Sequence, residues 1–191
     1  MILQEKQLET IFSKYRLSSY SSFDEYKHNI AYSKGFYPCL AIIEVAFRNK
    51  INNFMMNANS DWLSNKDSLG SCYNLVEKTK KKLKKDNKVV SNASLVPELN
   101  FGFWVNLLSP HKTGFSFKTK HLKKIFGKDF SVSKSDLYHK LQKVLDFRNR
   151  VFHYEKVLGY SKFVDIEIVM NQILEIIDTD LLEIVRDIES L

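Results

Sequence analysis

Cysteine is scarce in this sequence. Cys39 and Cys72 are the two cysteines in 191 residues, and neither has another cysteine or a histidine at the spacing of a metal-binding motif. A disulfide framework and a structural zinc site are therefore not predicted. His111, His121 and His139 are scattered, without a carboxylate or cysteine partner at ligand spacing. We expect no metal site and no cofactor.

A long apolar run is also missing. No uninterrupted apolar segment approaches the length of about 18 residues that marks a membrane-spanning helix. The first residues enter an amphipathic pattern directly, without a basic and then apolar leader. No repeat with a period of roughly 20 to 50 residues is visible, which argues against a solenoid. We expect a soluble, cytoplasmic protein with no membrane partner.

Large apolar side chains, by contrast, are plentiful. Hydrophobic residues make up 44% of the chain, including 14 phenylalanines and 9 tyrosines, and this composition excludes a mainly disordered protein. A length of 191 residues fits one ordinary domain. We expect a single domain over residues 1–191, with a basic and partly irregular insertion around 57–130.

Charge is distributed unevenly along the chain. The formal net charge is +7, but residues 155–191 hold nine acidic and three basic side chains, so the first 154 residues carry +13. Such a separation is typical of a polyanion-binding body with an acidic closing helix. The charge distribution therefore favours a protein that binds nucleic acid over one that does not.

Apolar residues recur at helical spacing through most of the sequence. This pattern, with its serine, proline and glycine boundaries, predicts an all-α helical bundle. The expected helices cover approximately 2–15, 23–35, 40–54, 97–108, 133–153 and 162–190. The segment 40–54 is the most apolar, and we expect it to be the central core helix, with the two long C-terminal helices packed on it.

The segment 97–108 contains several aromatic residues. Pro97 suits the first turn of a helix, and the aromatic side chains follow it at helical spacing. Phe101, Phe103 and Trp104 suit stacking on nucleobases, but large apolar residues in this pattern are more often core. We expect them to be buried. Residues 109–117 form a loop or a short hairpin.

The segment 146–153 carries the strongest chemical signal. It places Arg148, Asn149 and His153 on one predicted helix, with Asn149 and His153 one turn apart. Metal-free RNA cleavage requires a group that transfers protons near neutral pH, which suits histidine. It also requires a cation for the phosphorane charge, which suits arginine. These three residues are the candidate catalytic site, with Asn149 orienting the imidazole or a ribose hydroxyl.

A purely structural interpretation of the same segment stands beside this one. Asp146 and Arg150 have the spacing of an ion pair along a helix, and His153 has the position of a residue that ends one. An arginine and a histidine five residues apart also occur together often by chance.

The segment from Arg148 to His153 resembles the Arg-x4–6-His motif of HEPN ribonucleases, including the polar residue that often follows the arginine. The chain as a whole resembles the bacterial abortive-infection Abi-like (AbiD/AbiF) family. The segments that carry the resemblance are 43–49, 101–108 and 146–153, in the expected order. The similarity covers approximately residues 5–185.

This resemblance implies a HEPN-like bundle that acts as a metal-independent endoribonuclease in phage defence. It also implies a composite site in which two copies bring their motifs together. The earlier pair Arg48 and Asn49 has Asn53 where a second motif would need histidine, so a complete composite site requires another subunit. Some members are associated with small noncoding RNAs, and the alternative is a noncatalytic RNA-binding protein that holds such an RNA.

Basic residues outside the motif are candidate RNA contacts. Seven lysines occur between positions 78 and 88, and a second group follows at 118–124. Such runs are also the usual composition of a solvated helix face. The candidate RNA-binding residues are Lys80, Lys81, Lys82, Lys84, Lys85, Lys118, Lys120, Lys123, Lys124 and Arg150. A helical scaffold for protein partners remains a third alternative.

Overall fold

The computed structural model of the chain describes residues 5–113 and 115–191, and within these residues it contains helices and no strand. This confirms the all-α prediction. The helices are α1 (Glu5–Phe12), α2 (Lys14–Leu17), α3 (Phe23–Gly35), α4 (Tyr37–Ala58), α5 (Lys66–Leu69), α6 (Tyr73–Lys85), α7 (Asn92–Glu98), α8 (Phe101–Asn106), α9 (Thr119–Phe126), α10 (Lys134–Phe152), α11 (Ile166–Ile177) and α12 (Leu181–Glu189). Three short 3-10 turns are η1 (Trp62–Ser64), η2 (Gly70–Cys72) and η3 (Ser161–Phe163).

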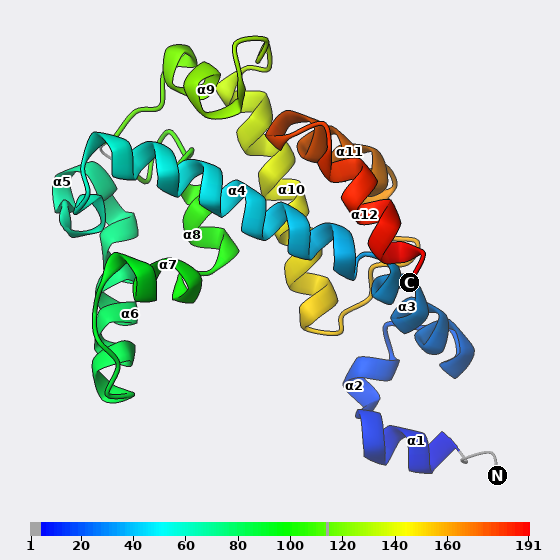
Figure 1. Cartoon of the computed structure of the whole chain (residues 1–191). Helices are drawn as coiled ribbons and strands as arrows, with labels where there is room; N and C mark the ends of the chain where they lie inside the picture. Colours follow the sequence, from blue (N-terminus) through cyan, green and yellow to red (C-terminus); the bar gives the residue numbers. More distant parts are fainter. Residues whose placement is uncertain (1–4, 114) are drawn as a thin grey trace.

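Helix α4 is the centre of the fold. It starts after the turn at Phe36 and has Pro38 in its first turn, where the missing proline N–H leaves no helical bond unmade. Its residues Ile43, Phe47 and Ile51 are completely buried. Helices α11 and α12 pack on α4, and α10 packs between α11 and α8 (Figure 1). The predicted central core helix is confirmed.

Part of the segment 57–130 belongs to the main core. Helix α8 packs against both α4 and α10. Its residues Phe101, Phe103 and Trp104 are at most 1% exposed, as expected for core aromatics, and the indole of Trp104 donates to the carbonyl of Leu99 at 3.1 Å. The segment predicted as a basic, partly irregular insertion therefore supplies helix α8 to the body of the bundle, while α6 extends away from it (Figure 1).

The prediction that Pro97 begins a helix is wrong. Pro97 lies in the last turn of α7, and the next helix begins only at Phe101. The physical reason is Asn100, whose side-chain oxygen accepts from the backbone N–H of Phe103 at 2.9 Å and caps α8. The asparagine side chain satisfies a backbone N–H at the start of the helix that would otherwise have no partner. Pro97, three residues earlier, cannot supply such an acceptor.

The last predicted helix, over 162–190, is broken in two. Helix α11 ends at Ile177, Asp178 is extended, and α12 begins at Leu181. The carboxylate of Asp178 pairs with Lys50 of α4 at 3.3 Å. This break allows Val185 of α12 to turn back and become buried near α4.

The N-terminal segment is likewise divided. The expected helix over 2–15 becomes α1 and α2, separated by Ser13 with a backbone φ of 65°. Residues 1–4 of that expected helix lie outside the described residues. The side chain of Ser13 caps α2 by accepting from the N–H of Arg16. The kink brings Arg16 to the C-terminal end of α10, where the candidate motif lies.

Candidate functional site

The candidate motif forms the C-terminal end of α10. Ser133 caps the start of this helix by accepting from the N–H of Asp136 at 3.0 Å, and the helix ends at Phe152. His153 is therefore the first residue after the helix. Its N–H still donates to the carbonyl of Asn149 at 2.9 Å, which keeps the two residues one turn apart. Both are exposed.

Tyr154 stops the helix. Its backbone is left-handed, with a φ of 58°, and its N–H donates to the carbonyl of Val151. The N–H of Glu155 donates to the carbonyl of Arg150 at 2.8 Å, which completes a Schellman motif. Glycine usually occupies this position because a side chain costs free energy there. His153 thus also ends the helix, as the structural interpretation of the segment predicts.

Arg148 is held by α4 rather than left free. Its Nε lies 3.4 Å from Oε2 of Glu44, and its guanidinium stacks over the ring of Phe152 at 4.6 Å. The Arg148 and Glu44 side chains are each 26% exposed. The Nε itself is buried and has no hydrogen-bond acceptor among the described residues. The Nε therefore has a charge partner in Glu44 but no hydrogen bond of good geometry.

The ion pair that the structural interpretation expects between Asp146 and Arg150 does not form. Asp146 instead pairs with Lys162 at 2.6 Å. Arg150 pairs with Glu155 at 3.4 Å, donates to the carbonyl of Lys156 at 3.1 Å and stacks over Tyr160 at 4.4 Å. Arg150, a candidate RNA contact, therefore also shapes the loop that follows His153.

Asn29 organises that loop from α3, and the sequence interpretation did not single it out. Its side chain is fully buried. The amide oxygen accepts from the backbone N–H groups of Val157 at 2.8 Å and Leu158 at 3.0 Å, and the amide nitrogen donates to the carbonyl of Glu155 at 3.1 Å. One side chain thus satisfies three backbone groups of the segment 155–158.

Two cations complete the attachment of this loop to the N-terminal segment. The guanidinium of Arg16 donates to the carbonyl of His153 at 3.4 Å and to that of Tyr154. A cation at a helix C-terminus is favourable because the last carbonyls carry partial negative charge. Lys156 pairs with Glu25 of α3 at 2.5 Å and donates to the carbonyl of Ser19 at 3.1 Å.

The pair of Glu25 and Lys156 predicts an acid dependence. Hydrogen bonding to Lys156, and then to Ser21, lowers the pKa of Glu25 from 4.5 to about 2. Because the folded-state pKa is depressed, the stabilisation is complete above pH 4.5 and is lost as the pH falls toward about 2. We expect the difference in thermal unfolding between wild type and Glu25→Gln to shrink through this interval. A difference unchanged down to pH 2 would contradict the pairing.

The predicted RNA-binding lysines of α6 are partly engaged within the fold. Lys80 pairs with Glu77 at 3.0 Å, and Lys82 pairs with Glu98 at 2.7 Å. Lys81, Lys84 and Lys85 are exposed. Two of the five candidates on this helix therefore have their charge countered by a carboxylate, and three face solvent.

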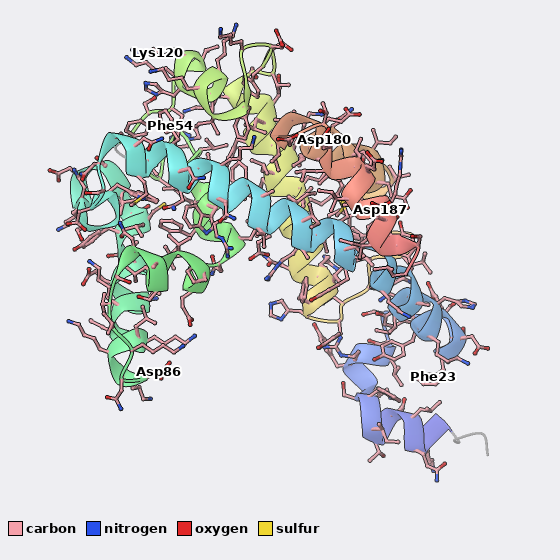
Figure 2. The ribbon with its side chains drawn as sticks, in the orientation of Figure 1. Phe23, Phe54, Asp86, Lys120, Asp180 and Asp187 are labelled. Carbon is pink, nitrogen blue, oxygen red and sulfur yellow. The ribbon has the colours of Figure 1, made fainter. Side chains whose placement is uncertain are left out.

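The lysines near α9 form a separate basic surface. Lys118, Lys120, Lys123 and Lys124 are all exposed. Desolvation, and then the charges of Lys120, Lys118 and Lys124, lower the pKa of His121. Helix α9 lies near the start of α10 (Figure 1), and α10 extends about 28 Å from Lys134 to His153. Figure 2 shows Lys120 at the top of the view and Asp86, which follows α6, well below it on the left. The structure does not gather these lysines around the motif.

Comparison with protein families, curated proteins and solved structures finds no match to this chain. Within the described residues, no group of three or more histidine, cysteine or acidic side chains could hold a metal ion. No single helix in the same part of the chain is long and apolar enough to cross a bilayer, although α3 and α4 taken together meet the length and composition.

Proposed function

We propose that this protein is a HEPN-like, metal-independent endoribonuclease that acts on RNA in the cytoplasm as part of phage defence. The observation that carries the proposal is the end of α10. There, a partly buried arginine held by Glu44 stands beside the exposed Asn149 and His153. The resemblance of the segment 148–153 to the HEPN motif supplies the reaction class.

The chemistry follows from the residue types. His153 takes the proton of a ribose 2′-hydroxyl, whose oxygen attacks the adjacent phosphorus, and the 5′-oxygen leaves with a proton. Arg148 stabilises the charge on the phosphorane, because its guanidinium keeps a fixed charge and forks onto phosphate oxygens. Glu44 holds the guanidinium by charge attraction. Asn149 orients the imidazole or the ribose.

A second copy of the chain would complete the site. The motif supplies one histidine per chain, whereas one proton is removed and another delivered in each cleavage. Two motifs facing each other would provide a base and an acid at once. The proposal therefore includes a homodimer or a higher homo-oligomer.

The test is cleavage of mixed single-stranded and hairpin RNA in EDTA. We expect wild type to cut and Arg148→Gln to cut about 100-fold or more slowly, because removal of one such donor has effects of this size. The matched control is Arg186→Gln, which removes an exposed arginine of α12. Equal rates for wild type and Arg148→Gln, with both folded, would reject the assignment of Arg148.

A noncatalytic RNA-binding protein is the second candidate. The observation that favours it is the pairing of Arg148 with Glu44, which counters the charge that catalysis would use. The exposed lysines of α6 and α9 would then hold a partner noncoding RNA. This function predicts RNA that copurifies in stoichiometric amount, salt-sensitive binding, and no cleavage by wild type in EDTA.

A further inference from the structure

A polar pocket lies directly beside the motif, between the N-terminal segment and the loop after His153. Its volume is about 360 Å³. The pocket is lined by two serines and by the charged and aromatic side chains of Tyr15, Arg16, Tyr20, Arg150, Glu155 and Lys156. The lining residues between Ser13 and Tyr20 belong neither to the motif nor to the two lysine groups.

The charge of the pocket favours an anion. Three cations line it against one carboxylate, Glu155, which pairs with Arg150. The charge of Lys156 is countered from outside the pocket by Glu25. Among the described residues, no ion pair joins Arg16 to a carboxylate, and its contacts with the His153 and Tyr154 carbonyls use one of its nitrogens. Arg16 therefore keeps both its charge and further donors for a ligand.

The aromatic residues of the pocket identify the class of anion. Tyr15 is 91% exposed at the rim, whereas Tyr20 is partly buried and stacks with the ammonium of Lys156 at 5.3 Å. An exposed tyrosine one residue from an arginine is a suitable platform for a base whose phosphate binds the arginine. A small inorganic anion on Arg16 would leave the ring of Tyr15 unused.

We propose that this pocket binds one nucleotide of a single-stranded RNA, with its phosphate on Arg16 and its base on Tyr15. The proposal rests on RNA being the ligand of the motif and adds the subsite that positions the strand. Because Arg16 donates to the backbone carbonyl of His153, a phosphate on Arg16 would lie at the end of α10 that carries the motif. Arg16 is thus a positioning residue.

The experiment measures binding without cleavage. A fluorescently labelled RNA hexanucleotide with 2′-O-methyl groups lacks the attacking hydroxyl, so its fluorescence anisotropy reports affinity alone. We expect Arg16→Gln to weaken binding about tenfold and to reduce the slope of log K against log salt by about one. Tyr15→Ala is expected to weaken binding by about fivefold or more through lost stacking.

The control is Lys14→Gln, which removes a charge from the same helix but not from this pocket. We expect less than a twofold effect. If Arg16→Gln is poorly folded, Tyr15→Ala still decides, because that side chain is almost completely exposed. Wild-type affinity in both pocket variants would overturn the proposal. Equal losses for Lys14→Gln and Arg16→Gln would also overturn it, as would equal affinity for an acidic hexapeptide.

The outcomes for binding and cleavage are separable. If wild type binds the hexanucleotide in a manner that depends on Arg16 and Tyr15 but cuts no RNA, the subsite stands and the nuclease proposal fails. If wild type cuts RNA and the two pocket variants bind normally, the nuclease proposal stands and the subsite fails.

Discussion

His153→Ala is expected to lose RNA cleavage in EDTA by at least about 100-fold, the lower end of what a positioned general acid or base contributes. The substitution removes the imidazole and leaves the helix end intact, because the hydrogen bonds of His153 within the described residues involve its backbone. The stability of the fold should change by no more than about 0.5 kcal/mol, as for other exposed positions. The measurement is the single-turnover cleavage rate together with a thermal unfolding curve.

His139→Ala is the matched control for that experiment. His139 is an exposed histidine of the same helix, about 21 Å of helix away from His153. We expect it to cleave at the wild-type rate. Equal turnover by wild type and His153→Ala would withdraw His153 from any catalytic role and leave the RNA-binding function as the better proposal.

Asn29→Ala is expected to lower the free energy of unfolding by about 3 kcal/mol, because it leaves several buried backbone groups without a partner. The amide now satisfies Glu155, Val157 and Leu158 from a completely buried position. For a domain of this size the loss corresponds to a decrease in Tm of roughly 10 °C. Calorimetry of the purified variant measures it directly.

Asn53→Ala is the control for Asn29→Ala, because Asn53 is an exposed asparagine on α4. We expect its Tm to stay close to that of wild type. We also expect Asn29→Ala to reduce RNA cleavage, since the loop that it releases begins two residues after His153. An unchanged Tm for Asn29→Ala would show that the loop is held by other contacts.

The helices that the sequence predicts well are those with regular apolar spacing and clear end signals. Helix α4 begins two residues after Gly35 and has Pro38 in its first turn, and α10 begins after the serine cap Ser133. The breaks at Ser13 and Asp178 carry no proline or glycine, and they exist because of contacts made elsewhere in the fold. The local sequence pattern does not predict such breaks, because they depend on tertiary packing.

The candidate site likewise contains residues that the sequence predicts and residues that it does not. Arg148, Asn149 and His153 are adjacent in sequence, so their proximity follows from the helix alone. Glu44 has a detectable signal, because it is the one charged residue between Phe36 and Phe47 in an otherwise apolar helix. Asn29 has no such signal, because it lies in a polar helix and its partners in the loop are 126 to 129 positions away.

Those long separations have a consequence for synthesis. The bonds that fix the loop after His153 reach back to Asn29 and Arg16 across more than 120 residues. At about 5 to 20 residues per second, a ribosome needs on the order of ten seconds to pass from one set of partners to the other. Loop closure of this length also delays folding. We expect the loop after His153 to become ordered late, once residues 153–158 have been synthesised and can bond to Arg16 and Asn29.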